Sequence, residues 1–364
     1  MNKKKIVFVL NAIVTRCIKR VEEFIANGYD VDVYAFNRGG EPYVQPKNFQ
    51  ITIIGEHNLT MGILRRSFVI GKSLHTLFKK YKKEDIVYYF FFFDVASIGH
   101  LFCKKPYIYE ESDMPYTTRG VKSVRRVMAK IDKRVITHSL LTTMTSEGFI
   151  DFHYGNHRPE NIIVVPNRVN ERLLSVTYSE TELNINHLRF SFVGGFRYGS
   201  TLNFFRVAAE HFPNHSFSVY GNIIRFKEEI EELARKYKNI YLKGRFKNPE
   251  DLPLIYSQTD IVLANYDAHS INAQYAEPNK LYESIFFHTP ILVSSNTFLA
   301  KKVTKLGIGY NIDSYNNDEI ISFIRNITEE DIIIKQNKAK MMPKSVSVNK
   351  NPELFQYLRN HGVG

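Results

Sequence analysis

Residues 188–200, Leu-Arg-Phe-Ser-Phe-Val-Gly-Gly-Phe-Arg-Tyr-Gly-Ser, join an apolar run of strand length to a glycine-rich loop. A segment of helical period, 201–211, follows at once. Strand, loop and helix in this order form the repeating unit of a parallel sheet that is covered by helices on both faces. The same alternation extends from this stretch in both directions along the chain.

The apolar runs predict strands in both halves of the chain, and helical segments fill most of the gaps. In the first half the predicted strands are 6–11, 30–36, 50–54, 85–93, 106–110, 140–143 and 162–165. In the second half they are 188–193, 216–220, 239–242, 260–264 and 290–293. Beyond Thr297 the pattern predicts helices only, and the last one, around 352–360, is a candidate to cross back onto the first domain.

A polar stretch with weak periodicity, 170–187, separates the two runs of strands and marks the domain boundary. We therefore predict an α/β protein with two Rossmann-like domains. The predicted parts are an N-terminal domain, a linker, a C-terminal domain and a returning helix, at 1–169, 170–187, 188–345 and 346–364.

Length and composition favour a two-domain globular protein: 364 residues, 44% apolar and 24% charged. Cys17 and Cys103 stand far apart without a CxxC or Cys/His pattern, which argues against a disulfide framework and a structural zinc site. A reducing, cytoplasmic compartment is the expectation. The apolar runs 6–10 and 86–93 are better explained as buried strands than as a signal peptide or a membrane span.

Positive charge is concentrated in the first half of the chain. Of the net charge of +12, +10 falls within residues 1–170, and its densest runs are 79–83 and 119–134. A solvated helix face, an anionic membrane surface and an acidic acceptor all remain open as explanations. A nucleic-acid partner is disfavoured, because the basic runs lack the interleaved stacking aromatics of a recognisable module.

Three loops that follow predicted strands carry candidate site residues, because ligands of open α/β sheets bind beyond the carboxyl ends of the strands. The first is 192–200, where Gly194 and Gly195 would let backbone N–H groups approach a phosphate and Arg197 would add charge-assisted hydrogen bonds. A tight turn with a solvent-facing arginine remains the alternative.

The second loop is Glu277-Pro-Asn-Lys-Leu-Tyr-Glu283. Pro278 suits the first position of a helix, whose N-terminal amides and dipole attract a diphosphate. Asn279 and Glu283 stand four residues apart and share a helix face, and Lys280 would point near the phosphates. The alternative is an ordinary helix start with a Lys280–Glu283 ion pair on the surface.

The third loop, 109–116, contains Glu111 and Asp113. Carboxylates at a strand end can hold sugar hydroxyls, act as a base or bind a cation. A solvated acidic loop is the alternative, and one such cluster does not establish a metal site.

These residues resemble the family 4 glycosyltransferases, the large retaining group with the two-domain GT-B fold. The resemblance is strongest from Thr145 onward, and the ordered set of pieces carries it. The pieces are 145–150, 163–169, 192–195, 220–221, 242–244, 260–263 and 278–283.

The resemblance implies a nucleotide-sugar donor, UDP- or GDP-linked, held mainly by the second domain. It implies Glu283 on the ribose, Arg197 and Lys280 on the diphosphate, and residues 243–246 by the nucleobase. The acceptor would enter from the first domain, and the cleft across which the two domains face each other would close by a hinge motion. Transfer would retain the anomeric configuration without a protein nucleophile and without an obligatory metal or cofactor.

The chain departs from the family pattern at three positions. Tyr275 stands where the family has the first of two glutamates, and Glu277 is the nearest carboxylate. No lysine follows Arg197 within a few residues, so Lys280 would compensate. Glu111 and Asp113 take the place of a histidine that in the family contacts the donor sugar.

The sequence thus assigns two groups of site residues. The catalytic group is Arg197, Lys280, Glu277, Asp113 and Glu111. The donor-binding group is Gly194, Gly195, Lys243, Arg245, Pro278, Asn279 and Glu283, and no metal ligand is assigned.

The expected activity is a retaining sugar transfer to a glycan or lipid-linked acceptor in the synthesis of a cell-surface polysaccharide, such as a capsule. The transfer would take place at the cytoplasmic face of a membrane, and the basic first half would contact anionic lipid. Two alternatives stay open: a GT-B-fold sugar-nucleotide epimerase, and an inactive member of the family that serves as a binding or scaffold subunit.

Overall fold

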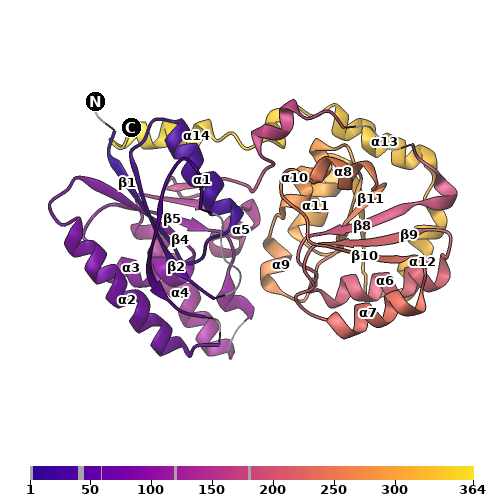
Figure 1. Ribbon diagram of the computed structural model, residues 1–364, viewed down its shortest axis with the longest axis horizontal. Coiled ribbons are helices and arrows are strands. Elements are labelled where there is room, and N and C mark those ends of the chain that lie inside the picture. The colour runs from indigo at the N-terminus through magenta and orange to yellow at the C-terminus, as the bar shows by residue number, and fades with distance from the viewer. Residues whose placement is uncertain (1–2, 40–44, 59, 119–120, 179–181) are drawn as a thin grey trace. The chain divides into compact units, whose positions relative to one another are not determined.

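The computed structural model describes residues 3–39, 45–58, 60–118, 121–178 and 182–364, and the chain divides into two compact units (Figure 1). Unit 1 comprises the chain up to Val165 together with Asn351–Gly364, and unit 2 comprises Pro166–Lys350. The stretch proposed as a linker, 170–187, belongs with unit 2 as far as it is described, and it contains the short 3₁₀ helices Glu171–Ser175 and Ile185–His187. Arg119 and Gly120 of the basic run lie outside the described residues.

Unit 1 is built on a seven-stranded parallel sheet in the order β3-β2-β1-β4-β5-β6-β7. The strands are β1 Lys5–Leu10, β2 Val31–Asn37, β3 Ile51–Glu56, β4 Ile86–Phe91, β5 Tyr107–Glu111, β6 Leu141–Met144 and β7 Ile162–Val164. The helices are α1 Thr15–Ala26, α2 Ile63–Lys80, α3 Phe93–Phe102, α4 Lys122–His138, α5 Glu147–Tyr154 and α14 Pro352–Asn360. The order reverses between β1 and β4, the kind of switch point at which Rossmann-like sheets bind ligands.

Helices lie on both faces of this sheet. The last helix, α14, lies beside α1 (Figure 1), and Phe355 packs against Phe24 with ring centroids 5.1 Å apart. On the other face α2, α3 and α4 lie side by side. Because both faces are covered, the central strands β1 and β4 are almost wholly apolar or aromatic, and every residue of β4 is buried.

The strand predicted for 85–93 is two residues too long at its carboxyl end. Phe92 has a positive φ of 72°, and Phe93 is already the first residue of α3. The run of aromatic residues hid this turn, because a buried strand and the start of a buried helix have the same apolar composition.

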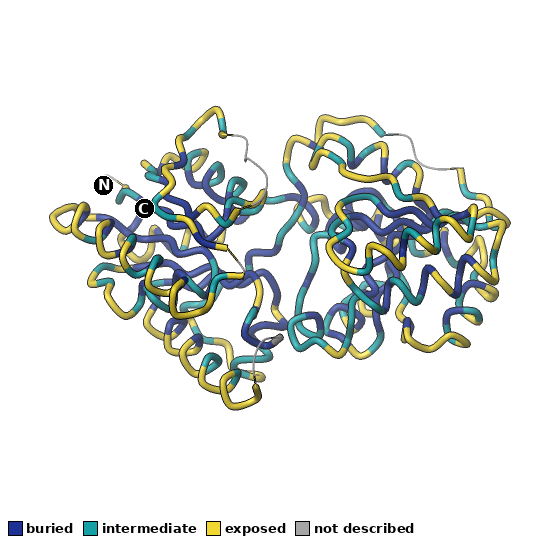
Figure 2. The backbone as a smooth tube through the Cα atoms, turned by 60° about the horizontal axis from the view of Figure 1, so that its bottom comes forward, coloured by how far each residue is buried: buried dark blue, intermediate teal, exposed yellow. Residues whose placement is uncertain are grey.

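Unit 2 contains a second parallel sheet of six strands in the order β10-β9-β8-β11-β12-β13. The strands are β8 Arg189–Val193, β9 Ser216–Tyr220, β10 Ile240–Gly244, β11 Ile261–Ala264, β12 Ile291–Ser294 and β13 Gly309–Ile312. The helices are α6 Gly199–His211, α7 Lys227–Lys236, α8 Leu252–Ser257, α9 Ile271–Tyr275, α10 Asn279–Phe286, α11 Phe298–Leu306, α12 Asn317–Asn326 and α13 Glu329–Lys340. In each unit the central strands are buried, while the edge strands are partly exposed and the outer faces of the helices are exposed (Figure 2).

The prediction of helices alone beyond Thr297 is wrong at β13. This edge strand has a weak sequence signal, Gly-Tyr-Asn-Ile, and it forms because it pairs with β12. Gly309 is required there, since a Cβ atom at this position would lie 2.0 Å from the carbonyl oxygen of Ile291.

Among the described residues, no helix is both long and apolar enough to span a lipid bilayer.

Candidate functional site

The carboxyl edge of the second sheet is formed by closely packed glycine loops. Gly194, after β8, has φ 134°, and its amide donates to the carbonyl oxygen of Tyr220 at 2.7 Å. Gly221, after β9, packs against it so closely that a Cβ atom there would lie 2.2 Å from the carbonyl oxygen of Gly194. The strand order reverses between β8 and β11, so this edge is also the switch point of the sheet.

Part of the phosphate prediction for the loop 192–200 is wrong. The amide of Gly194 is used by the neighbouring strand, and the first amides of α6 are used by a carboxylate: Ser200 donates to Asp267 Oδ1 at 2.9 Å and Gly199 to Oδ2 at 3.4 Å. These N–H groups are therefore not available to a phosphate. In the described part of the chain, the amide of Gly195 has no acceptor.

Lys280 is the main cation at this edge, and it is buried. Only 4% of the residue is exposed, and Nζ donates a 3.0 Å hydrogen bond to the Tyr266 hydroxyl. Nζ also lies 4.6 Å from the centre of the Phe192 ring, and a Cβ atom on Gly194 would lie 3.0 Å from it. The ammonium group thus sits directly beneath the backbone of the glycine loop.

The ammonium group of Lys280 makes no ion pair with any described residue. Burial lowers its pKa from 10.5 to about 8, although the charge of Glu283 acts in the opposite direction. The alternative of a Lys280–Glu283 ion pair on the surface is therefore wrong. An anion that binds next to this buried ammonium group would stabilise its charged form.

Helix α10 begins one residue later than predicted, with Pro278 as its N-cap and Asn279 as its first residue. The amides of Asn279 and Lys280 have no protein acceptor in the described part of the chain. Two free N–H groups and a buried ammonium group therefore lie at the positive end of one helix. This combination can bind an anion.

Glu283 is held rigidly one turn further along α10. Its Oε2 accepts from the Tyr256 hydroxyl at 2.8 Å, and its Oε1 accepts from Asn279 Nδ2 at 2.5 Å. The residue is 2% exposed. Both carboxylate oxygens are therefore fixed in orientation.

Two tyrosines that the sequence interpretation missed connect Arg197 to Lys280. Arg197 is exposed, and its Nε donates to the Tyr198 hydroxyl at 3.3 Å. The Tyr198 ring stacks on Tyr266 with centroids 4.3 Å apart, and Tyr266 accepts the hydrogen bond from Lys280. Tyr266 lies two residues beyond the end of β11, so a search of every strand end would have found it.

Other predicted residues lie elsewhere in unit 2. Glu277 is buried, and its Oε2 accepts from Lys302 Nζ and from the Tyr282 hydroxyl, each at 2.6 Å. Lys243 lies within β10 and Arg245 follows its last residue; both are exposed, and Arg245 Nε donates to Asn222 Oδ1 at 2.7 Å. Neither residue contacts Lys280.

In unit 1, the two carboxylates of the loop 109–116 differ in environment. Asp113 has a 55% exposed side chain that lies 3.9 Å from Arg16. Glu111 is completely buried, and its Oε1 lies 2.8 Å from His153 Nε2. The interpretation of this stretch as a wholly solvated acidic loop is therefore wrong.

Glu111 belongs to a buried cluster with Asp132 and His153. His153 Nε2 is 3.7 Å from Asp132 Oδ2, and the hydroxyls of Tyr109 and Tyr116 donate to the Asp132 carboxylate at 3.0 and 2.7 Å. Burial, together with the charge of Glu111, raises the pKa of Asp132 to about 8. Burial lowers the pKa of His153, but the two carboxylates outweigh it, and the net shift is upward.

Each of the three residues has an oxygen or nitrogen atom of the kind that binds metal ions, and these atoms lie within 4.8 Å of one another. Glu111 Oε1, His153 Nε2 and the Asp132 carboxylate are engaged with one another and with the two tyrosines, whereas Glu111 Oε2 is buried without a hydrogen-bond partner among the described residues. Asp132 and His153 lie 21 and 42 residues after Glu111 in the sequence. No local sequence pattern therefore connects them to Glu111.

Comparison with known proteins shows the fold. No protein-family model matches the chain, and no curated protein sequence matches it. The sucrose-phosphate synthase of Thermosynechococcus elongatus matches with a TM-score of 0.71 at 12% identity, over 99% of both chains. HepE of Anabaena, solved with UDP and glucose, matches with a TM-score of 0.66 at 13% identity, over 98% of both chains.

A third structure, described as a UDP-N-acetylglucosamine 2-epimerase from Listeria monocytogenes, matches with a TM-score of 0.66 at 10% identity, over 99% of this chain and 97% of its own. All three are similar to this chain over nearly their whole length. The chain therefore has the two-domain GT-B fold, as predicted, with two Rossmann-like parallel sheets.

Proposed function

We propose that the protein is a glycosyltransferase that takes a sugar from a nucleoside-diphosphate donor bound to unit 2. The observation that carries the proposal is Lys280, a buried ammonium group at the start of α10 that forms no ion pair with any described residue. A protein tolerates such a group where a ligand supplies the missing negative charge. The likeness of the fold to HepE, solved with UDP and glucose, supports a nucleotide-sugar donor.

Different residues of unit 2 bind different parts of the donor. Lys280, the free amides of α10 and Arg197 face the diphosphate, whose charge grows as the bond to the sugar breaks. A hydrogen-bond donor that faces the charge developing in the transition state typically lowers the activation free energy by about 3 to 4 kcal/mol. Glu283 accepts from the ribose hydroxyls. Gly195 permits close approach of the backbone, and Lys243 and Arg245 flank the base.

The transfer retains the anomeric configuration without a protein nucleophile, and the two cations supply the charge that a metal ion would otherwise provide. In unit 1, Asp113 is the exposed carboxylate that can meet an acceptor hydroxyl. Glu111 is buried and acts by positioning this loop. Glu277 keeps Lys302 and Tyr282 in place behind α10.

The acceptor is a glycan or lipid-linked glycan of a cell-surface polysaccharide, reached from the cytoplasm at the membrane face. The excess positive charge of the first half of the chain supports this part of the proposal.

The experiment is a thermal-shift titration with UDP, GDP and their sugar conjugates. A nucleotide at a hundred times its Kd should stabilise the protein by about 2.7 kcal/mol. The expected result is a shift with one base only, which Lys280→Met and Glu283→Gln remove. Lys301→Met, an exposed lysine on α11, is the matched control and should keep the shift. Absence of a shift with any nucleotide would overturn the proposal.

Epimerisation of the sugar nucleotide is the second candidate, because the epimerase from Listeria monocytogenes shares the fold. Incubation of the donor without an acceptor separates the two activities. Conversion to an epimer would establish the second candidate, whereas product that forms only with an acceptor would establish the transferase. Binding without either reaction would indicate a scaffold subunit.

A further inference from the structure

Helix α4 exposes a strip of apolar side chains. Val124, Val127 and Ile131 are 44, 57 and 41% exposed, and Val121, just before the helix, is 66% exposed. Spacings of three and four residues place the three helical side chains on one face. An exposed apolar strip on a helix is more than scattered surface hydrophobicity and calls for a partner.

The same helix carries many cations and no exposed acid. Its basic residues are Lys122, Arg125, Arg126, Lys130, Lys133 and Arg134. Its single acid, Asp132, is completely buried. Within the part of the chain that the structure describes, Lys122, Arg126, Lys130 and Arg134 form no ion pairs, so their charge is directed to the outside.

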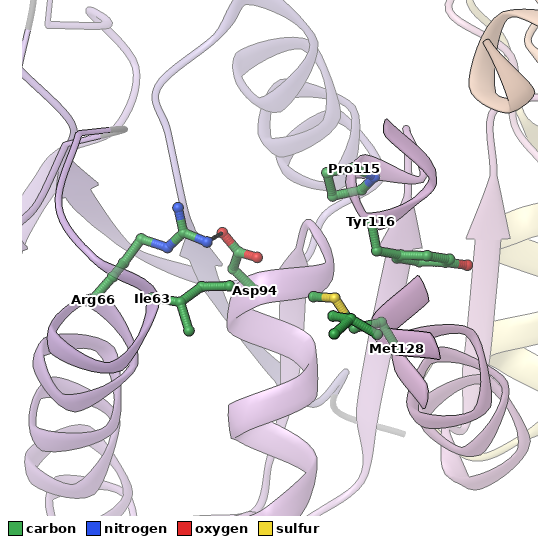
Figure 3. Close-up of a pocket in the computed structure, with 7 residues that line it drawn as sticks. Ile63, Arg66, Asp94, Pro115, Tyr116 and Met128 are labelled. Carbon is green, nitrogen blue, oxygen red and sulfur yellow. Dashed lines mark ion pairs between the residues drawn. The ribbon is translucent and has the colours of Figure 1, made fainter. Parts of the chain in front are cut away.

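The apolar strip continues onto the first turn of α2. Ile63 and Val124 line one small pocket together with Met128, next to the ion pair of Arg66 with Asp94 (Figure 3). Ile63 is 53% exposed, and its neighbour Leu64 is 85% exposed. Helices of a parallel sheet begin at the carboxyl edge of the strands, so this surface lies at the edge where unit 1 presents Asp113.

We propose that this surface, made by α4 and the first turn of α2 and here called the α4 surface, binds anionic lipid bilayers by inserting its apolar strip among the headgroups. A cationic helix with an exposed apolar strip has the composition of an interfacial membrane helix. The lysine run 79–83 differs: Lys79, Lys80, Lys82 and Lys83 are exposed around a buried Tyr81, without an apolar strip. That run can attract a membrane by charge but cannot insert.

The inference deepens the membrane contact within the proposed function by naming its surface, and it does not require the transferase reaction. The test uses the full chain and vesicles of phosphatidylglycerol mixed with phosphatidylcholine, with pure phosphatidylcholine for comparison. The protein should sediment with the mixed vesicles only. Arg126→Gln with Lys130→Gln should weaken the partition coefficient about fivefold per residue removed. Lys82→Gln with Lys83→Gln, an equal change of charge, should weaken it much less.

Insertion is measured separately from charge. In a Cys103→Ser background, an environment-sensitive dye on Val127→Cys should shift to the blue with mixed vesicles, while the same dye on Ile333→Cys of α13 should not shift. Ile333 is 41% exposed and therefore a matched site. Val124→Ser with Val127→Ser should abolish sedimentation, and Ile333→Ser with Ile334→Ser should preserve it, both with unchanged melting temperatures.

Three outcomes would overturn the proposal. The first is that the protein does not sediment with mixed vesicles. The second is that Lys82→Gln with Lys83→Gln weakens the partition coefficient as much as Arg126→Gln with Lys130→Gln. The third is sedimentation without a shift of the dye at position 127. If the α4 variants change self-association of the protein instead, the strip is an interface between two copies. Nucleotide thermal shifts recorded on the same variants should be unchanged. A failure of the donor site can thus be told apart from a failure of the α4 surface.

Discussion

Replacement of Lys280 by methionine should stabilise the protein while it removes donor binding. Folding lowers the pKa of this lysine from 10.5 to about 8, which corresponds to a cost of about 3 kcal/mol when the charged form is buried. Methionine has a similar length and no charge. The lost hydrogen bond to Tyr266 offsets part of the gain, by about 1 kcal/mol. We therefore expect the free energy of unfolding to rise by about 1 to 2 kcal/mol near pH 7.

The sign of the pH dependence follows from the same shift. Below about pH 8 the lysine is charged in both the folded and the unfolded chain, so the full cost is present. Between about pH 8 and pH 10.5 the folded chain loses the proton first, and the cost disappears. The advantage of Lys280→Met over the wild type should therefore shrink as the pH rises through this window.

The assay is urea denaturation of both proteins at about pH 7 and about pH 9.5, with and without nucleotide. Lys301→Met is the control for a general effect of removing a lysine and should leave stability within about 0.5 kcal/mol of the wild type. A Lys280→Met variant that is less stable than the wild type at neutral pH would refute the reasoning. Such a result would mean that the charged ammonium group stabilises the fold even without a bound anion.

Three further predictions concern other parts of the two units. Gly221→Ala should destabilise unit 2 by more than about 2 kcal/mol, because the new methyl group would meet the Gly194 carbonyl oxygen at 2.2 Å and φ is 125°; thermal melting measures this. Asp132→Asn should flatten the pH dependence of stability between about pH 4 and pH 8, since a pKa raised to about 8 makes the wild-type fold lose stability as the pH rises through that window; denaturant titrations at several pH values report it. Tyr256→Phe should weaken nucleotide affinity about tenfold and lower the free energy of unfolding by about 1 to 3 kcal/mol, because the buried Glu283 carboxylate loses the donor that orients it; calorimetric titration and thermal melting measure the two effects.

Each of these has a matched control on the same unit. Gly244→Ala introduces a side chain at a positive φ of 73° with no atom within 4 Å, so it reports backbone strain without the steric clash. Asp151→Asn changes an acid on α5 that is partly exposed and should leave the pH profile unchanged. Tyr241→Phe alters an exposed tyrosine and should leave nucleotide affinity unchanged. A control that behaves like its partner would contradict the corresponding explanation.

The parallel sheets were predictable because their strands are buried on both faces. Runs such as Ile86–Phe91 and Ile261–Ala264 have no polar interruption, which is the composition of a strand covered by helices on both sides. The edge strand β13 was not predictable, because its four residues carry a glycine and an asparagine and are held by pairing with β12. Its strand conformation is a consequence of the neighbour rather than of local propensity.

The candidate site was predictable where the chemistry is local. Asn279, Lys280 and Glu283 stand within one turn of a helix that follows a strand, and helical spacing alone brings Asn279 against Glu283. The partners of these residues come from elsewhere: Tyr266 from the end of β11, and Tyr256 from α8. No spacing in the sequence relates them.

The sequence by itself determined the class of fold and the helix start that carries Lys280 and Glu283, because periodicity and helix geometry are local properties of the chain. Only the tertiary structure decided the state of those groups. It buried Lys280 without an ion pair to any described residue, engaged Gly194 and Asp267 in hydrogen bonds within unit 2, and drew Glu111 into a cluster with His153. Burial and long-range contacts set the charge and the accessibility of a side chain, and both depend on segments that are distant in the sequence.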